Sequence, residues 1–88
     1  MRTISGKNRI KGDWQSLVGQ QIVAVVNSAP DARRAFAQVH LVFSDGCSFE
    51  IFSTTGDLGG SSRLYRGDLA EVLGYMTEHR HVQVFEAP

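Results

Sequence analysis

Apolar and polar residues alternate from Val39 to Ser53, and the alternation is interrupted by the dipeptide Asp45-Gly46. A period of two is typical of a β-strand with one buried face, and Asp-Gly between two such runs is the strongest short-range signal for a β-hairpin. The sequence therefore predicts an antiparallel hairpin that turns at this dipeptide.

The loop length decides which residues of the hairpin oppose each other, because opposed residues of an antiparallel pair point to the same face of the sheet. A two-residue loop would set Phe43 against Ser48 and so pair apolar with polar residues. A loop of residues 44–46, with Gly46 in the left-handed conformation as a bulge, matches residues of like character. The predicted pairs are, on an apolar face, Phe43 with Cys47, Leu41 with Phe49 and Val39 with Ile51, and, on a mixed face, Val42 with Ser48, His40 with Glu50 (a candidate ion pair) and Gln38 with Phe52.

Two further segments are predicted to be strands. The run from Ile22 to Val26, within residues 20–27, is apolar on both faces, which is typical of a central strand covered on each side. Residues 81–85 alternate in part and predict a last strand.

The segment between the first strand and the hairpin allows two interpretations. Ser28 and Pro30 indicate a turn, after which a strand from about Phe36 would return beside residues 20–27. A short helix over residues 31–37 is the alternative, because its alanines favour a helix.

A helix is predicted from about Asp68 to Glu78. Asp68, followed three residues later by Glu71, has the pattern of a capping box. Apolar residues then follow at the spacing of one helix face: Leu69, Val72, Leu73 and Met76. Gly74 costs about 1 kcal/mol relative to alanine inside a helix, so we expect a close backbone contact there.

The N-terminal part is predicted to hold a short helical turn over residues 14–18. Asp13 would cap this turn, Gly19 would end it in the left-handed conformation, and Trp14 and Leu17 would anchor it to the core. Residues 1–12 carry only basic charges and predict a flexible basic arm or a short edge strand.

Together these elements predict an α+β fold. It would contain a single antiparallel sheet of about four or five strands, with one main amphipathic helix near the C-terminus packed on one face. Residues 13–88 would form one globular domain, because 88 residues leave room for one core, and residues 1–12 would form the arm.

The charge balance argues against several classes of partner. Nine Lys and Arg against nine Asp and Glu give a formal net charge of zero, so no overall field attracts nucleic acid or an anionic membrane. The single cysteine, Cys47, rules out an intrachain disulfide framework. Without an apolar segment of signal-peptide or membrane-spanning length, we expect a cytoplasmic protein.

The sequence offers few groups for catalysis or metal binding. His79 and His81 are spaced to share one face of a strand, and His40 or Glu50 would join them only if the last strand ran beside the hairpin. Cys47 and His40 lie on opposite faces of the predicted hairpin, so they cannot form a nucleophile pair. We therefore predict no catalytic residues, no metal and no cofactor.

Residues 54–67 are rich in Gly and Ser and are predicted to form a loop, with a short strand around residues 63–66. Within this segment Ser61, Ser62 and Arg63 are candidate ligands for an anion such as a phosphate. The segment lacks the Gly-Lys-Ser/Thr ending of a phosphate-binding loop, so a flexible connection is the preferred interpretation.

One helix covers only one face of a sheet whose central strand is apolar on both. We expect the mixed face to remain uncovered, and we predict an interaction surface that contains Trp14, Val42 and Phe52. The leading hypothesis is a small non-enzymatic protein–protein interaction module, with another protein or a second copy as partner. The alternative is a small anion- or nucleotide-binding protein that uses residues 55–63.

Overall fold

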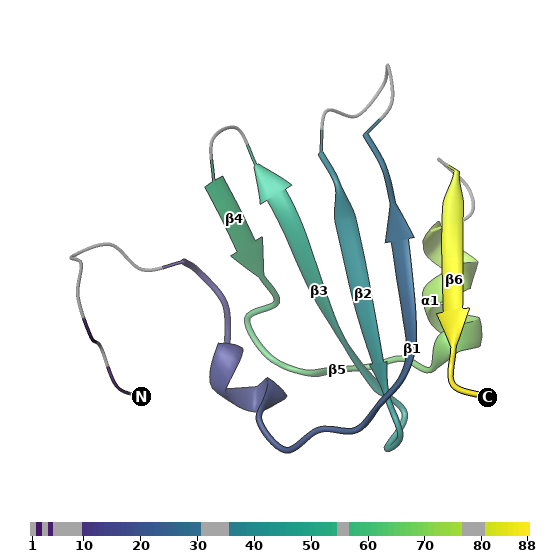
Figure 1. Cartoon of the computed structure of the whole chain (residues 1–88), viewed down its shortest axis with the longest axis horizontal. Helices are drawn as coiled ribbons and strands as arrows, with labels where there is room; N and C mark the ends of the chain where they lie inside the picture. Colours follow the sequence, from purple (N-terminus) through teal and green to yellow (C-terminus); the bar gives the residue numbers. More distant parts are fainter. Residues whose placement is uncertain (1, 3, 5–9, 31–35, 55–56, 77–80) are drawn as a thin grey trace.

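The computed structural model describes residues 2, 4, 10–30, 36–54, 57–76 and 81–88. Its elements in chain order are η1 (Trp14–Leu17), β1 (Ile22–Ser28), β2 (Gln38–Phe43), β3 (Cys47–Thr54), β4 (Asp57–Gly60), β5 (Tyr65–Arg66), α1 (Leu69–Met76) and β6 (Val82–Glu86). The strands form one antiparallel sheet in the order β4-β3-β2-β1-β6, and β5 also pairs with β3 (Figure 1). The predicted antiparallel sheet is confirmed, and among the described residues those in strands far outnumber those in the one short α-helix.

The β2–β3 hairpin has the register that the three-residue loop predicts. Its rungs run from Gln38 opposite Phe52 to Val42 opposite Ser48. The apolar and mixed faces of the hairpin therefore contain the residues that the sequence assigned to them.

The hairpin turn itself is held by backbone geometry and by one side chain. Gly46 has a φ of +83°, and its N–H donates to the Phe43 carbonyl at 3.1 Å. The Asp45 Oδ1 atom accepts from the Cys47 N–H at 3.0 Å. The left-handed glycine is thus confirmed, and the aspartate adds an Asx contact of the kind that favours turns.

β1 lies between β2 and β6, which confirms it as a central strand. The return strand β2 begins at Gln38, and the ladder extends back to Ala37. The N–H of Ala37 donates to the Ser53 hydroxyl at 2.9 Å, and its carbonyl accepts from the Ser53 N–H at 3.1 Å. The alternative helix over residues 31–37 falls largely on residues 31–35, which lie outside the described residues.

α1 begins after Asp68, whose Oδ1 accepts from the Glu71 N–H at 3.0 Å. This contact confirms the aspartate half of the predicted cap. Gly74 is exposed within α1, and apart from its chain neighbours and the backbone of its own helix, a Cβ built there would meet no described atom within 4 Å. The predicted close backbone contact at Gly74 is therefore wrong.

The helix covers the opposite face of the sheet from the one predicted. Val72 and Met76 of α1 pack against Ala24, Val26 and Val42. The strand pairing places further residues on this face, hereafter the α1 face: His40, Ser48, Glu50, Phe52 and Val84. Because Ala24 and Val26 of β1 lie on this mixed face, α1 packs there, and Figure 1 shows it behind β6.

The other face, hereafter the open face, is the apolar face of the hairpin. Its members on β1, β2, β3 and β6 are Val25, Val39, Leu41, Phe43, Phe49, Ile51 and Phe85. Near β4 this face is covered by η1, since the Trp14 ring lies 5.5 Å from the Phe49 ring between centroids. At the β6 edge Phe85 is 56% exposed.

η1 forms where the sequence predicts a helical turn, but the hydrogen bonds at its N-terminus differ from the predicted side-chain cap. The Asp13 side chain makes no cap hydrogen bond. Its backbone carbonyl instead accepts from the Ser16 N–H at 3.2 Å and from the Ser16 hydroxyl at 2.6 Å. Gly19 has a φ of +87°, which confirms the left-handed end of this segment.

The Gly/Ser-rich segment is not a plain loop, because residues 57–60 form the edge strand β4. A Cβ at Gly59 would lie 2.7 Å from the Phe52 ring, and one at Gly60 would lie 2.9 Å from both Phe49 and Trp14. Glycine is depleted in strands in general, and here it is required because aromatic rings occupy the space of the missing side chains.

The end of the predicted arm is attached to the β4 edge. The Gly60 N–H donates to the Lys11 carbonyl at 2.8 Å, and the Asp13 N–H donates to the Ser61 carbonyl at 2.8 Å. Lys11 forms an isolated parallel bridge with Gly59. Residues 10–12 form no strand beyond this single bridge, and residues 1, 3 and 5–9 of the predicted arm lie outside the described residues.

Candidate functional site

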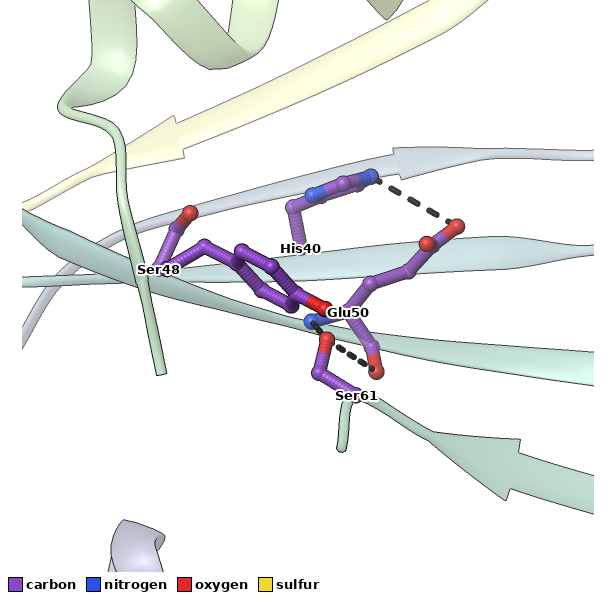
Figure 2. Close-up of a pocket in the computed structure, with 5 residues that line it drawn as sticks. His40, Ser48, Glu50 and Ser61 are labelled. Atoms are coloured by element: carbon purple, nitrogen blue, oxygen red, sulfur yellow. Dashed lines mark hydrogen bonds and ion pairs between the residues drawn. The ribbon is translucent and has the colours of Figure 1, made fainter. Parts of the chain in front are cut away.

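Polar side chains line a pocket of about 260 Å³ on the α1 face (Figure 2). They come from β2, β3, the residue after β4, and β5: His40, Ser48, Glu50, Ser61 and Tyr65. The pocket exists because α1 lies over β1, while β3 presents two polar side chains on the same face.

His40 and Glu50 are opposed in the sheet and meet in the pocket. The His40 Nε2 atom lies 3.7 Å from the Glu50 Oε2 atom, which also accepts a hydrogen bond from the Gln38 amide. Burial lowers the pKa of His40, and the nearby Glu50 carboxylate opposes this shift without cancelling it. The predicted contact is present, but it joins a carboxylate to an imidazole whose burial favours the neutral form.

Ser61 fixes the backbone of Glu50. Its hydroxyl accepts from the Glu50 N–H at 2.8 Å and lies 3.4 Å from the Glu50 carbonyl oxygen (Figure 2). Its own N–H donates to the same carbonyl at 2.9 Å. Ser61 therefore extends the pairing along the edge of β3, between β4 and β5. Its hydroxyl already forms hydrogen bonds with the Glu50 backbone.

Ser48 is a buried hydroxyl that lines the pocket. The residue is 3% exposed, and no side chain or backbone group of the described residues forms a hydrogen bond with its Oγ. A Cβ at Gly67 would approach this oxygen to 3.1 Å. Buried hydroxyls are usually hydrogen-bonded, and this one lines the pocket.

Tyr65 closes the pocket from β5 and links it to the predicted anion ligands. Its hydroxyl lies 3.2 Å from the Ser62 hydroxyl, and the Arg63 guanidinium lies 4.9 Å from the ring centroid. The hydrogen bond with Ser62, followed by that with Arg63, lowers the pKa of Tyr65. Ser62 and Arg63 are thus exposed around Tyr65, whereas Ser61 lines the pocket and its hydroxyl is bonded to the Glu50 backbone.

The predicted interaction residues are also separated. Val42 is 1% exposed and belongs to the core beneath α1. Phe52 is half-buried on the α1 face beside Gly59, and Trp14 is half-buried over Phe49 on the open face. The sequence assigned Val42 to a surface because it placed the helix on the wrong face.

The predicted separation of Cys47 from His40 holds, since the two lie on opposite faces of the hairpin. Cys47 is half-buried, and this burial together with the Asp45 carboxylate raises the pKa of its thiol. Among the described residues, no three His, Cys, Asp or Glu side chains are grouped as a metal site would need. β6 runs beside β1, so it does not bring residue 81 next to the hairpin.

Sequence reasoning found His40, Ser48 and Glu50 on one face and Ser61 as a candidate ligand, but missed the pocket that they share. Tyr65 lies in the short strand predicted around residues 63–66, but nothing in the sequence linked it to His40 and Glu50. The available signal was the mixed face itself, because four of its six hairpin residues are polar: Gln38, His40, Ser48 and Glu50.

No family model, curated protein or solved structure matches this chain. Over the described part of the chain, no helix combines the length and apolar character needed to cross a membrane. Any functional conclusion therefore depends on the geometry of the chain itself.

We expect the stability of the protein to fall as the pH drops below about 6.5, the ordinary pKa of histidine. Burial lowers the pKa of His40 in the folded state, so its stabilising contribution is complete above 6.5 and is lost as the pH falls through the lowered folded pKa. Urea unfolding at pH 7.5 and at pH 5.5 measures this loss. The variant His40→Gln should show a smaller loss between the same two pH values, and an equal loss would contradict the assignment.

Proposed function

We propose that this protein is a small protein–protein interaction module that associates through the open face of its sheet, with a second copy of the chain as partner. The observation that carries the proposal is the partial cover of this face. Among the described elements η1 covers only the side near β4, and Val25, Val39, Leu41 and Ile51 are half-buried. Exposed apolar residues that are contiguous favour association.

A second copy suits this face because its centre carries no charge. The residues of β1, β2 and β3 that point there are Val25, Asn27, Val39, Leu41 and Ile51. Two such faces would meet without like-charge repulsion, in the manner of two sheets that pack about 10 Å apart. Each Å² of apolar surface removed from water would contribute about 25 cal/mol.

The test is the absolute mass in solution over a wide concentration range, by light scattering coupled to size exclusion. We expect a concentration-dependent dimer, which Phe85→Ser weakens. The matched control is Val84→Ser: Val84 is the neighbour of Phe85 on β6, is 40% exposed, and points to the α1 face.

Each outcome decides the proposal. A dimer that Phe85→Ser weakens and Val84→Ser does not supports association through the open face. Equal effects of the two variants would locate the contact at the β6 edge and reject the open face. A strict monomer at all concentrations would reject self-association.

A further inference from the structure

We propose that the polar pocket on the α1 face binds a small organic cation that carries a primary ammonium group. This inference is independent of association through the open face, because the pocket lies on the opposite side of the sheet. It rests on three features of the pocket. The first is a buried hydroxyl without a hydrogen bond to a described residue. The second is a carboxylate with one oxygen that contacts no described residue, and the third is a described lining whose other polar groups are uncharged hydrogen-bond acceptors.

The buried hydroxyl belongs to Ser48. The residue is 3% exposed. None of the described residues forms a hydrogen bond with its Oγ. Leaving such a group unpaired costs about 1–3 kcal/mol. A ligand with N–H donors that enters the pocket would satisfy this oxygen, so the hydroxyl is better explained as part of a binding site than as a packing residue.

The carboxylate belongs to Glu50, whose side chain is 28% exposed. Within the described residues, its contacts with Gln38 and His40 are both made by Oε2. Oε1 therefore remains as an acceptor. Ser61 forms hydrogen bonds with both the N–H and the carbonyl of Glu50, so the carboxylate extends from a backbone position that is fixed in the sheet.

The charge of the lining selects a cation. Glu50 is the acidic residue of the lining, and burial keeps the facing imidazole of His40 in its neutral form at pH 7. The hydroxyls of Ser48 and Tyr65 add further acceptors. An anion would meet the Glu50 carboxylate, whereas an ammonium group would form a charge-assisted hydrogen bond with it.

The size of the pocket limits the ligand. A volume of about 260 Å³ lies just below the range of about 300–1,000 Å³ that accommodates drug-sized molecules. The pocket therefore suits an amine of roughly amino-acid size. A metal ion is disfavoured, because the described residues of the lining supply only His40 and Glu50 from the usual set of strong ligands.

The experiment is a titration of ¹⁵N-labelled protein at pH 7.5, followed by amide chemical shifts. The probes are benzylamine, its neutral analogue benzyl alcohol and its anionic analogue benzoate, which share one ring and differ in charge. We expect benzylamine alone to shift the amides of Ser48, Glu50 and Ser61 in a saturable manner. Equal shifts with benzoate, or no saturable shift with benzylamine, would overturn the proposal.

Two variants separate a site from a general charge effect. Glu50→Gln keeps the shape and the acceptor but removes the charge, and it should weaken benzylamine binding about tenfold. Glu86→Gln is the matched control, since Glu86 is an exposed carboxylate on the same face of the sheet, at the β6 edge. Unchanged affinity in Glu50→Gln, or an equal loss in Glu86→Gln, would refute binding in the pocket.

Ser48→Ala distinguishes binding from packing. Removing an unpartnered buried hydroxyl should leave the free protein as stable as before or more stable, while benzylamine binds more weakly. A loss of stability with unchanged benzylamine affinity would show that Ser48 serves the fold alone and would contradict its role in the site.

Discussion

Replacing Phe49 with alanine should lower the free energy of unfolding by about 3–5 kcal/mol. Phe49 is 1% exposed, and its ring packs against the Trp14 ring beside Gly60. Alanine would remove this ring from the point where η1 is attached to the sheet. Because a small domain is stable by only about 5–15 kcal/mol, this loss is a large fraction of the total.

The control for Phe49 is Phe85→Ala. Phe85 has the same side chain on the same face of the sheet, but it is 56% exposed at the β6 edge. In urea unfolding of dilute protein we expect a change of about 0.5 kcal/mol or less. Similar losses for both variants would show that the open face is packed as tightly beside β6 as it is beneath η1.

Replacing Gly60 with alanine should destabilise the protein by about 1–3 kcal/mol, the usual cost of overpacking a core. The added Cβ would lie 2.9 Å from the Phe49 ring and 2.9 Å from the Trp14 ring. Phe49 is buried and cannot move away without disturbing the sheet. Thermal or urea unfolding measures the loss, and an unchanged stability would contradict the close packing of β4 on these rings.

The control for Gly60 is Gly74→Ala, which should act in the opposite direction. Gly74 lies within α1 and has open space around its Cβ position. Alanine should therefore raise the free energy of unfolding by about 0.5–1 kcal/mol through helix propensity alone. The opposite signs of the two glycine variants would separate steric packing from backbone entropy.

The hairpin register was predictable because its information is local. Alternation and the turn at Asp45-Gly46 lie within one segment, and only one loop length matches residues of like character. The cap at Asp68 and the left-handed Gly19 were predictable for the same reason, since each depends on neighbouring residues.

The strand β4 was not predictable, because its sequence, Asp57-Leu58-Gly59-Gly60, has the composition of a loop. These glycines are accounted for only by Phe52, Phe49 and Trp14, which are distant in the chain. The face covered by α1 was also beyond local reasoning. Both faces of the hairpin could accept an apolar helix, and the choice depends on where Ala24 and Val26 lie relative to Val72.

The candidate site was predictable only in part. The opposition of His40 and Glu50 follows from the register, and the mixed character of their face was visible in the sequence. The pocket also needs Tyr65 of β5, which reaches β3 only after the chain has passed through β4. No local pattern indicates that return.

The strand order has a consequence for the order of events during synthesis. β1 is made early, but one of its two neighbours, β6, is formed by residues 82–86. Until those residues leave the ribosome, one side of the Val-rich β1 has no partner strand from its own chain. Unpaired apolar edges of this kind favour aggregation. The edge of β1 that β6 covers is therefore the part of the sheet that is paired last as the chain is made.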